Sequence, residues 1–563
     1  MTVLAALFDP ALRFQRAYAE YLCARFRYLP FPGTRVTLDG EWVEPRGLKT
    51  TLASAQRVVI TGAPGVGKTT TLTYLAVNAA RRLLKNPHAP VPLFFSARAD
   101  ASLPSLYDLP RGLTLGDGLS ANTPRLFFPT LFARGRALVL IDDADALSAD
   151  ALRAALKEYH NATIIASAET PLADFVEYRL PGFRDGEIET FARKQGVAQA
   201  AAFVAALKSN NVPRVLTANP LTLRLLVHLW QHHLPLPTRR TALFDAYAQA
   251  IIPDTETLEL LENIALALQH GRPVSNEALA RSRGFLRAVK QRTVEFTHPL
   301  WQAYFAARAL YRAHDSASLR AHLADAAWRE VILFYAGWGD ATDVVLNLQS
   351  LGDEFLAARV AAHAHTLRAD VHAAIRETWL ARAYDGDPRA VAVLREMHDE
   401  RVVEECAQQL QSPDARVRER AARVLGQLQM DRAVDHLLPR LRDQDAAVRD
   451  AVVAALGHAY TDRVIEPLLV ALRGDTLRAV SPDLRMRVAA ARALGEIGSD
   501  KAVPALVVDL QQGTSEMRAA AADALKRIAS PLMSQALQSF VHSPDTELQR
   551  YAQEILATLN GNR

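Results

Sequence analysis

The stretch GAPGVGKTT, Gly62 to Thr70, decides the fold of the N-terminal half of this chain. It follows the apolar run RVVIT and precedes the helical pattern TLTYLAVNAARRLL, so it has the form G-x-x-x-x-G-K-[ST] between a strand and a helix. Glycines let such a loop turn its backbone N–H groups toward phosphate oxygens, and the N-terminus of the following helix adds a favourable dipole. The loop therefore predicts a phosphate-binding site, and its expected nucleotide contacts are Gly62, Pro64, Gly65, Val66, Gly67, Lys68, Thr69 and Thr70.

Charged and hydroxyl side chains in and near this loop point to nucleotide chemistry with Mg²⁺. Lys68 is placed to reach the terminal phosphates of ATP or ADP, and Thr69 to ligate the metal. The apolar run ALVLI then delivers Asp142, Asp143 and Asp145 at the C-terminal end of a buried strand, where an open α/β sheet keeps its ligand-binding residues. We expect Thr69 and Asp142 to hold Mg²⁺, and Lys68, Asp142 and either Asp143 or Asp145, which would orient water, to act in catalysis. A capped surface turn is the alternative for the acids.

Short apolar runs alternate with helical stretches around the loop. They are RVVIT at 57–61, PLFFS at 92–96, ALVLID at 137–142 and ATIIAS at 162–167. Continuous apolar strands separated by helices are typical of a parallel sheet with both faces covered. The fold class is therefore a parallel-sheet P-loop NTPase, of α/β type, followed by helical parts.

Composition bounds the remaining possibilities. The 563 residues suggest about three or four domains, and 50% hydrophobic with 22% charged residues is a globular balance. The net charge of +4 is spread among nearly as many acids, so a nucleic-acid partner is not favoured. Cys23 and Cys406 stand alone, which favours a reducing cytoplasm. Asp9 and Pro10 interrupt the apolar start, and no run reaches the roughly 20 apolar residues of a membrane span, so neither a secretory signal nor a span is expected.

Helical patterns dominate beyond residue 186, with one exception. GRPVS at 271–275 and RTVEFTH at 292–298 could supply the small β-hairpin of a winged helix.

The last 160 residues repeat. Leu410, Leu441, Leu472, Leu510 and Val541 open successive units at spacings of 31, 31, 38 and 31, the longer one including an insertion around Thr476 to Pro482. A fixed period with two helices per unit predicts an α-solenoid that resembles short HEAT repeats.

Three further features recur within these units. We expect the arginines of the apolar-Arg pairs to pair between helices, the Asp of each Ser-Pro-Asp to cap a second helix, and the glycines to end helices. The pairs are Val417-Arg418, Val448-Arg449, Met486-Arg487 and Met517-Arg518; the Ser-Pro-Asp strings are 412–414, 481–483 and 543–545; the glycines are Gly426, Gly457 and Gly495.

The order of motifs resembles the NACHT subgroup of STAND ATPases, the signal-transducing relatives of AAA-type enzymes. The resemblance covers about residues 15–340 in seven ordered elements. Besides GAPGVGKTT, they include the acidic string Asp142 to Ala146, Ala166-Ser167-Ala168, PGFRDGEIETFARKQ, Asn219-Pro220-Leu221, TRRTALFDAYAQAII and FTHPLWQAYFAARAL. Ala146 and Ala168 depart from the family, which has Glu and Arg there. The resemblance therefore implies nucleotide binding more firmly than turnover.

The resemblance also implies two nucleotide contacts outside the loop. In the family the proline of Asn-Pro-Leu lies against the nucleotide, a role that falls on Pro220. A winged-helix histidine contacts the β-phosphate of ADP and clasps the closed state, a role that falls on His298. A histidine that caps the start of a helix is the alternative interpretation of His298.

These patterns together predict six parts. They are an N-terminal helical lead at 1–46, the NACHT P-loop domain at 47–185, a helical domain at 186–236, a winged-helix domain at 237–312, a second helical or linker domain at 313–400 and HEAT-like repeats at 401–563.

The family resemblance implies a nucleotide-dependent signalling switch with weak ATPase activity. Its repeats would sense a ligand or protein trigger, its ATP-bound open form would homo-oligomerise, and a separate effector protein is possible, in immune or anti-phage defence. An ordinary P-loop remodelling ATPase and a HEAT scaffold with structural nucleotide remain as alternatives. GTP also stays open as the nucleotide, although the sequence has no N-K-x-D guanine motif.

Overall fold

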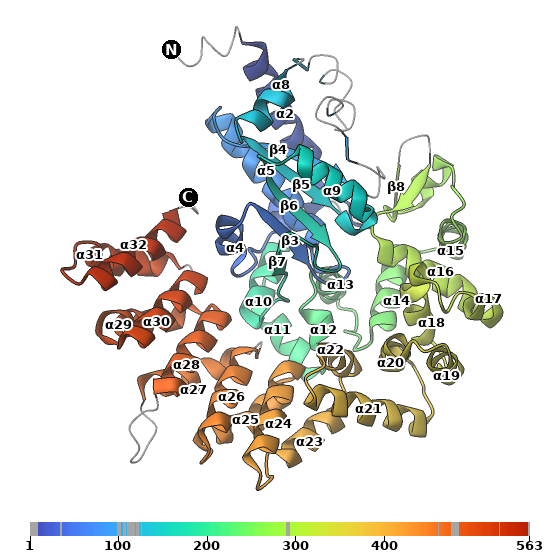
Figure 1. Ribbon diagram of the computed structural model, residues 1–563. Coiled ribbons are helices and arrows are strands. Elements are labelled where there is room, and N and C mark those ends of the chain that lie inside the picture. Colours follow the sequence, from blue (N-terminus) through green and yellow to red (C-terminus); the bar gives the residue numbers. More distant parts are fainter. Residues whose placement is uncertain are drawn as a thin grey trace. The chain divides into compact units, whose positions relative to one another are not determined.

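A parallel sheet follows directly from the apolar runs around Gly62–Thr70. In the computed structural model its strands are β3 (Arg57–Thr61), β4 (Val91–Ser96), β5 (Ala137–Asp142), β6 (Thr163–Ala168) and β7 (Val176–Arg179). They lie in the order β4-β5-β6-β3-β7, and every neighbouring pair is parallel (Figure 1). The predicted parallel sheet is confirmed, with β7 as an additional edge strand.

The structure describes residues 9–560 except 34–35, 98–102, 105–108, 110–118, 120–122, 125, 289–292, 460, 475–483 and 529. The chain divides into two compact units. The first comprises Met1–Gly182, Phe191–Val197 and Asn219–Leu221, and the second comprises Phe183–Thr190, Ala198–Ala218 and Thr222–Arg563. Each unit is described by itself.

Alternate residues of the strands bury on opposite faces of the sheet, as a two-faced sheet requires. Val59 and Ile164 belong to one apolar core, and Val58 and Ile165 to the other. The helices of this unit are α2 (Pro10–Arg25), α3 (Leu38–Glu41), α4 (Leu48–Ser54), α5 (Lys68–Lys85), α8 (Phe127–Ala133) and α9 (Ala149–Glu158), beside a small hairpin of β1 (Tyr28–Leu29) and β2 (Val36–Thr37). Helix α2 contributes buried aromatic and aliphatic side chains to the first core, so it packs with the sheet.

The second unit is almost wholly helical. Before the repeats it contains α11 (Ala200–Ser209), α12 (Arg214–Thr217), α13 (Pro220–Gln231), α14 (Arg240–Ile251), α15 (Thr255–Gln269), α16 (Pro299–Arg312), α17 (Ser316–Ala321), α18 (Arg329–Ala336), α19 (Thr342–Ser350), α20 (Glu354–His363), α21 (Ala369–Tyr384) and α22 (Pro388–Met397). Helix α10 (Asp185–Lys194) begins in this unit and ends in the first. Helix α13 is likewise divided between the units, because its first residues belong with Asn219–Leu221 to the first unit and the rest to the second.

A two-stranded antiparallel hairpin, β8 (Leu286–Ala288) and β9 (Val294–Phe296), interrupts these helices. Strand β9 lies within the predicted RTVEFTH run. The other predicted run, GRPVS, forms no strand in the structure and contributes one bridge from Ser275 to Thr293. The sequence FLRA pairs instead, because Phe285 and Leu286 supply the buried side chains that hold the hairpin to the helices.

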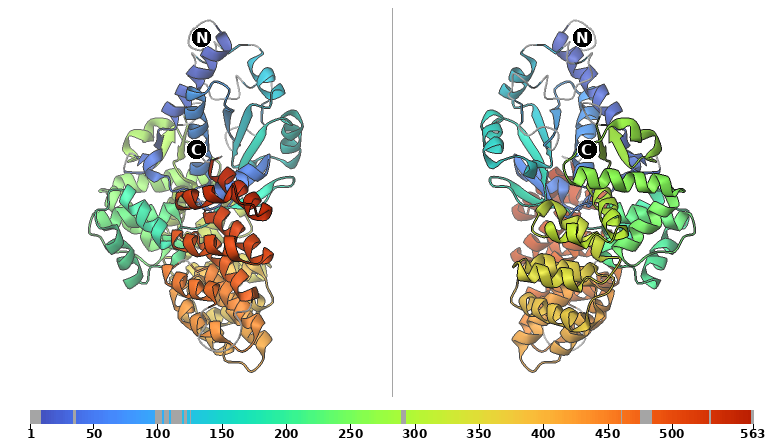
Figure 2. Two further views of the ribbon diagram at one scale, coloured as in Figure 1. Left: turned by 90° about the vertical axis from the view of Figure 1, so that its left-hand side faces the viewer. Right: turned by 90° about the vertical axis from the view of Figure 1, so that its right-hand side faces the viewer.

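The C-terminal helices come in pairs. They are α23 (Glu400–Gln409) with α24 (Ala415–Leu428), α25 (Asp431–Leu437) with α26 (Ala446–Gly457), α27 (Ile465–Arg473) with α28 (Leu484–Ile497), α29 (Val503–Gln512) with α30 (Ser515–Ile528), and α31 (Ser534–Phe540) with α32 (Thr546–Asn560). They stack in sequence order, orange to red in Figure 1 and in the left view of Figure 2. The predicted insertion Thr476 to Pro482 and the Ser-Pro-Asp at 481–483 lie outside the described residues.

Arginines of the second helices join successive repeats, as predicted. Arg418 pairs with Asp443 at 2.8 Å, Arg487 pairs with Asp509 at 2.5 Å and Arg518 pairs with Asp545 at 2.6 Å.

The fourth arginine departs from this pattern, because Arg449 donates to the carbonyl oxygen of Asp443 at 2.9 Å, within its own repeat. The two described caps are as predicted. The carboxylates of Asp414 and Asp545 accept hydrogen bonds from the first N–H groups of α24 and α32, which confirms both as N-caps.

The repeat glycines serve close packing between second helices, and the prediction that they end helices is wrong for two of them. Gly426 and Gly495 lie inside α24 and α28, and only Gly457 is a last residue. A Cβ atom at Gly426 would lie 2.4 Å from Cα of Ala455 in the next repeat, and one at Gly495 would lie 2.7 Å from Cα of Ala524. The helix backbones approach too closely for any side chain.

Gly426→Ala should therefore destabilise the repeats, although alanine favours a helix. Overpacking a fixed backbone costs about 1–3 kcal/mol, which outweighs the helix-propensity gain of up to about 1 kcal/mol. The matched control is Gly186→Ala in α10, where an added Cβ meets open space and should be neutral or stabilising. Urea unfolding of both variants measures the difference, and equal midpoints would contradict the packing role.

Candidate functional site

The Gly62–Thr70 loop joins β3 to α5 in a conformation that needs its glycines. Gly62, Gly65 and Gly67 have φ angles of 150°, 82° and 99°, a region that other residues rarely adopt. A Cβ atom at Gly62 would also lie 2.8 Å from Cγ1 of Val66, inside the loop. Helix α5 then begins at Lys68 and runs for 18 residues, so its N-terminal N–H groups border the loop.

Lys68 folds back over the loop. Its Nζ donates to the carbonyl oxygen of Gly62 at 2.7 Å. Burial lowers the pKa of Lys68, and the carboxylates of Glu169, Asp143, Asp145 and Asp142 act in the opposite direction. One partly desolvated ammonium thus lies among several carboxylates, an excess of negative charge that a divalent cation would reduce.

Asp142 ends β5 and is held by two hydroxyl groups. Thr69 Oγ1 donates to Asp142 Oδ1 at 3.0 Å, and Ser167 Oγ donates to the same oxygen at 2.7 Å. Asp142 is 6% exposed and Ser167 is fully buried. The structure therefore brings the two predicted Mg²⁺ ligands, Thr69 and Asp142, into direct contact.

Ser167 is a site residue to which the sequence assigned no role. It lies near the end of β6, the strand between β3 and β5, and so reaches both neighbours. Its hydroxyl also accepts a hydrogen bond from the N–H of Asp143 at 2.9 Å. A polar residue at the C-terminal end of a buried strand was the available signal. The sequence does not show the strand order, however, and it is this order that places Ser167 beside Asp142.

The two remaining acids follow β5 in a tight turn. Asp143 has a φ of 54°, a left-handed conformation that Asp tolerates. Asp145 is exposed in the short 3₁₀ segment Ala144–Ala146, and its Oδ2 accepts from the N–H of Glu169 at 3.1 Å. Both carboxylates border the loop, and Glu169 joins them although the sequence did not point to it.

The segment Asn219–Leu221 lies against the loop, which places Pro220 beside it. Asn219 Nδ2 donates to the carbonyl oxygen of Pro64 at 3.0 Å, and the N–H of Leu221 donates to that of Gly65 at 3.3 Å. Pro220 Cγ is 3.8 Å from the position of a Cβ on Gly67. The loop is therefore hydrogen-bonded to the N-terminal end of α13.

Two alanines occupy positions where the resembled family has charged residues. Ala146 ends the 3₁₀ segment after Asp145. Ala168 ends β6, is fully buried in the first apolar core and pairs with Thr61 across the sheet. Neither side chain can act on a phosphate.

His298 belongs to the second unit and caps a helix there. Its Nδ1 accepts a hydrogen bond from the N–H of Leu300 at 3.1 Å, and α16 begins at the next residue, Pro299. This is the alternative that the sequence left open, and the clasp role stays a prediction. Thr70 and Val66, the other predicted contacts, are half-buried in α5 and in the loop.

Comparison with known proteins identifies the C-terminal region. Residues 403–481 and 474–557 match the family model of HEAT repeats, which confirms the prediction made from the repeat period. No curated protein matches the chain.

Several solved structures resemble parts of the chain. An engineered protein is 25% identical, with 34% of this chain and 92% of that chain covered and a TM-score of 0.24. The complex of CpcE and CpcF of phycocyanin lyase from Nostoc sp. PCC7120 is 24% identical, with 33% and 76% covered and a TM-score of 0.22. The ORC2 protein of Aeropyrum pernix is 12% identical, with 54% and 95% covered and a TM-score of 0.24. TM-scores this low carry no argument about this chain.

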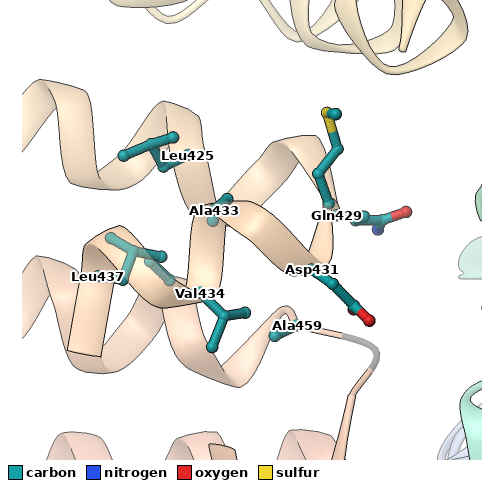
Figure 3. A pocket seen from close by; sticks show the side chains of 10 residues that line it. Leu425, Gln429, Asp431, Ala433, Val434, Leu437 and Ala459 are labelled. Atoms are coloured by element: carbon teal, nitrogen blue, oxygen red, sulfur yellow. The ribbon is translucent and has the colours of Figure 1, made fainter. Parts of the chain in front are cut away.

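Two other features of the described residues add no site. A pocket between α24, α25 and the end of α26 is lined by Leu425, Ala433 and Ala459 among others and has a volume of about 10 Å³, room for one water molecule at most (Figure 3). In the part of the chain that the structure describes, no helix is long and apolar enough to cross a membrane.

Ser167→Ala should destabilise the sheet unit by about 1–3 kcal/mol, because it removes a donor from buried Asp142 and an acceptor from the N–H of Asp143. Thr163→Ala, at the exposed start of the same strand, is the matched control and should change little. Urea unfolding monitored by far-UV circular dichroism compares the two. Equal midpoints would show that the hydroxyl does not hold the carboxylate.

Proposed function

We propose that this protein is a nucleotide-dependent signalling switch of the NACHT-type STAND class, in which a P-loop binds ATP or ADP with Mg²⁺ and the HEAT repeats receive a ligand or protein trigger. One observation carries the proposal. The glycine loop, the Thr69–Asp142 pair and the Asn219–Leu221 segment are hydrogen-bonded into one site.

The residues of this site fit a nucleotide and its metal. Gly62, Gly65 and Gly67 place no side chain on the loop at three positions, and helix α5 begins where phosphates would lie. Thr69 Oγ1 and the carboxylate of Asp142 are hard oxygen ligands of the kind Mg²⁺ prefers. When bound, the nucleotide supplies the phosphate charge that Lys68 and the metal neutralise.

Each side chain then has a defined task. Lys68 binds the terminal phosphates, while Asp142, held by Ser167, positions the metal. Asp143 or Asp145 orients a water molecule for hydrolysis. Ala146 and Ala168 leave two charged groups of the resembled family absent, so turnover is weak and the site holds nucleotide more than it consumes it.

A switch needs a segment whose contacts differ between the ADP-bound and the ATP-bound states. The Asn219–Leu221 segment supports such a role, because it contacts the loop and continues directly into α13. A change at the phosphates can therefore move the start of a helix whose remainder belongs to the second unit.

Lys68→Ala should abolish nucleotide binding. Wild-type protein should gain about 2.7 kcal/mol of stability at a Mg·ADP concentration of 100 times Kd, seen as a higher melting temperature. Lys68→Ala should show no such gain, whereas Lys85→Ala, exposed at the other end of α5, should keep it. If wild type itself showed no shift with Mg·ADP or Mg·GDP, the proposed function would be wrong.

His298 variants separate a clasp from a cap. If the imidazole holds the closed state, both His298→Ala and His298→Asn should oligomerise with a non-hydrolysable ATP analogue where wild type stays monomeric, and adding Lys68→Ala should restore the monomer. Asn caps helices well, so a purely capping role predicts that only His298→Ala is altered, through a loss of about 1 kcal/mol. Light scattering after size exclusion measures the mass.

A further inference from the structure

Arg184 makes an unusual contact inside the second unit. It immediately precedes α10, yet its side chain ends at repeat residues that lie 273 to 312 positions later in the chain, and it is 8% exposed. Nη1 donates to the carbonyl oxygen of Ala459 at 2.8 Å, and Nη2 donates to those of Gly457 and Glu496 at 3.0 and 3.3 Å.

These three acceptors suit a guanidinium in particular. Gly457 is the last residue of α26, Ala459 follows it, and Glu496 is the penultimate residue of α28. Carbonyl groups at the ends of helices lack partners within the helix and carry the negative end of its dipole. The planar fork of an arginine suits the ends of two helices, because its donors are spread over two Nη atoms, whereas a lysine ammonium places all its donors on one nitrogen. Figure 3 labels Ala459, which lies two residues after the end of α26.

A second contact fixes the same segment. Asp185 pairs with Arg214 and with Lys208, both at 2.6 Å, and Lys208 lies 3.9 Å from Asp431 of α25. Arg214 and Lys208 belong to α12 and α11. The ion pairs of Asp185 thus join the start of α10 to α11 and α12, and Lys208 of α11 makes one longer ionic contact with the repeats.

The segment is also linked to the candidate nucleotide site by a short path. The N–H of Phe183 donates to the carbonyl oxygen of Ala218 at 2.9 Å. Ala218 is bonded covalently to Asn219, whose side chain holds the carbonyl oxygen of Pro64 in the glycine loop. Two hydrogen bonds and one peptide bond therefore separate the loop from the residue next to Arg184.

We propose that Arg184 couples the HEAT repeats to the nucleotide site, so that the contact with α26 and α28 changes when nucleotide binds and a trigger on the repeats changes nucleotide affinity in turn. This inference rests on the proposed function. The coupling is reciprocal by thermodynamic necessity, and couplings of this kind amount to about 5- to 150-fold in an equilibrium constant. Arg184 acts as a positioning residue that touches no nucleotide.

The test is hydrogen exchange of α26 and α28 in the full chain, with and without Mg·ADP, alongside ADP binding measured on the same samples. In wild type, ADP should change exchange at the C-terminal ends of both helices by about fivefold or more. In Arg184→Ala, ADP should still bind while this response disappears, and Arg184→Lys should respond weakly.

The matched control is Arg418→Ala. Arg418 is also a buried arginine that donates to backbone carbonyls and pairs with a carboxylate, but it does so within the repeats alone. This variant should loosen the repeats and keep the ADP response, which separates coupling from mere stability.

Two results would overturn the inference. One is a full ADP response in Arg184→Ala and Arg184→Lys, and the other is wild type that binds ADP without any change in α26 and α28. If wild type does not bind ADP or GDP at all, the proposed function itself fails and the inference with it. Arg184→Lys keeps the charge and guards against a variant that does not fold.

Discussion

The hydrogen bonds between the Asn219–Leu221 segment and the glycine loop are the constraint on which the account depends. They join a loop whose backbone is fixed by left-handed glycines to the first turn of α13. They are the contacts through which a change in the loop can reach α13. With them, any displacement of the loop must either break two hydrogen bonds, at a cost of about 1 kcal/mol each, or move the helix.

The proposed metal ligands are brought together in a similar way. Thr69, Ser167 and Asp142 come from the loop, β6 and β5, and they meet because parallel strands bring their C-terminal ends to one edge of the sheet. Buried Asp142 is held by hydroxyl donors, and a metal would replace or share them. The repeats follow a different logic, in which Arg–Asp pairs and close glycine contacts fix each unit only to the next.

Much of the fold was predictable because its signals are local. The apolar runs gave the strands, the 31-residue period gave the repeats, and Asp414 and Asp545 gave helix starts. The site was predictable where residues share a motif, as do Lys68 and Thr69, or where one ends a buried strand, as does Asp142. Ser167, Glu169 and the amide of Asn219 depend on strand order and on chain segments that meet in space, so no spacing in the sequence could assign their contacts. The prediction that the repeat glycines end helices failed for the same reason. A side chain at these positions would clash with the backbone of the next repeat, and the sequence does not show that contact.

The most direct test of a nucleotide-operated switch is hydrogen exchange across α12 and α13 with Mg·ADP and, separately, with a non-hydrolysable Mg·ATP analogue. The account predicts that both nucleotides protect the glycine loop but that residues 215–231 exchange at different rates in the two complexes, because only a state-dependent contact can shift a population. Identical exchange of that segment in both complexes would contradict the switch and leave nucleotide a structural role.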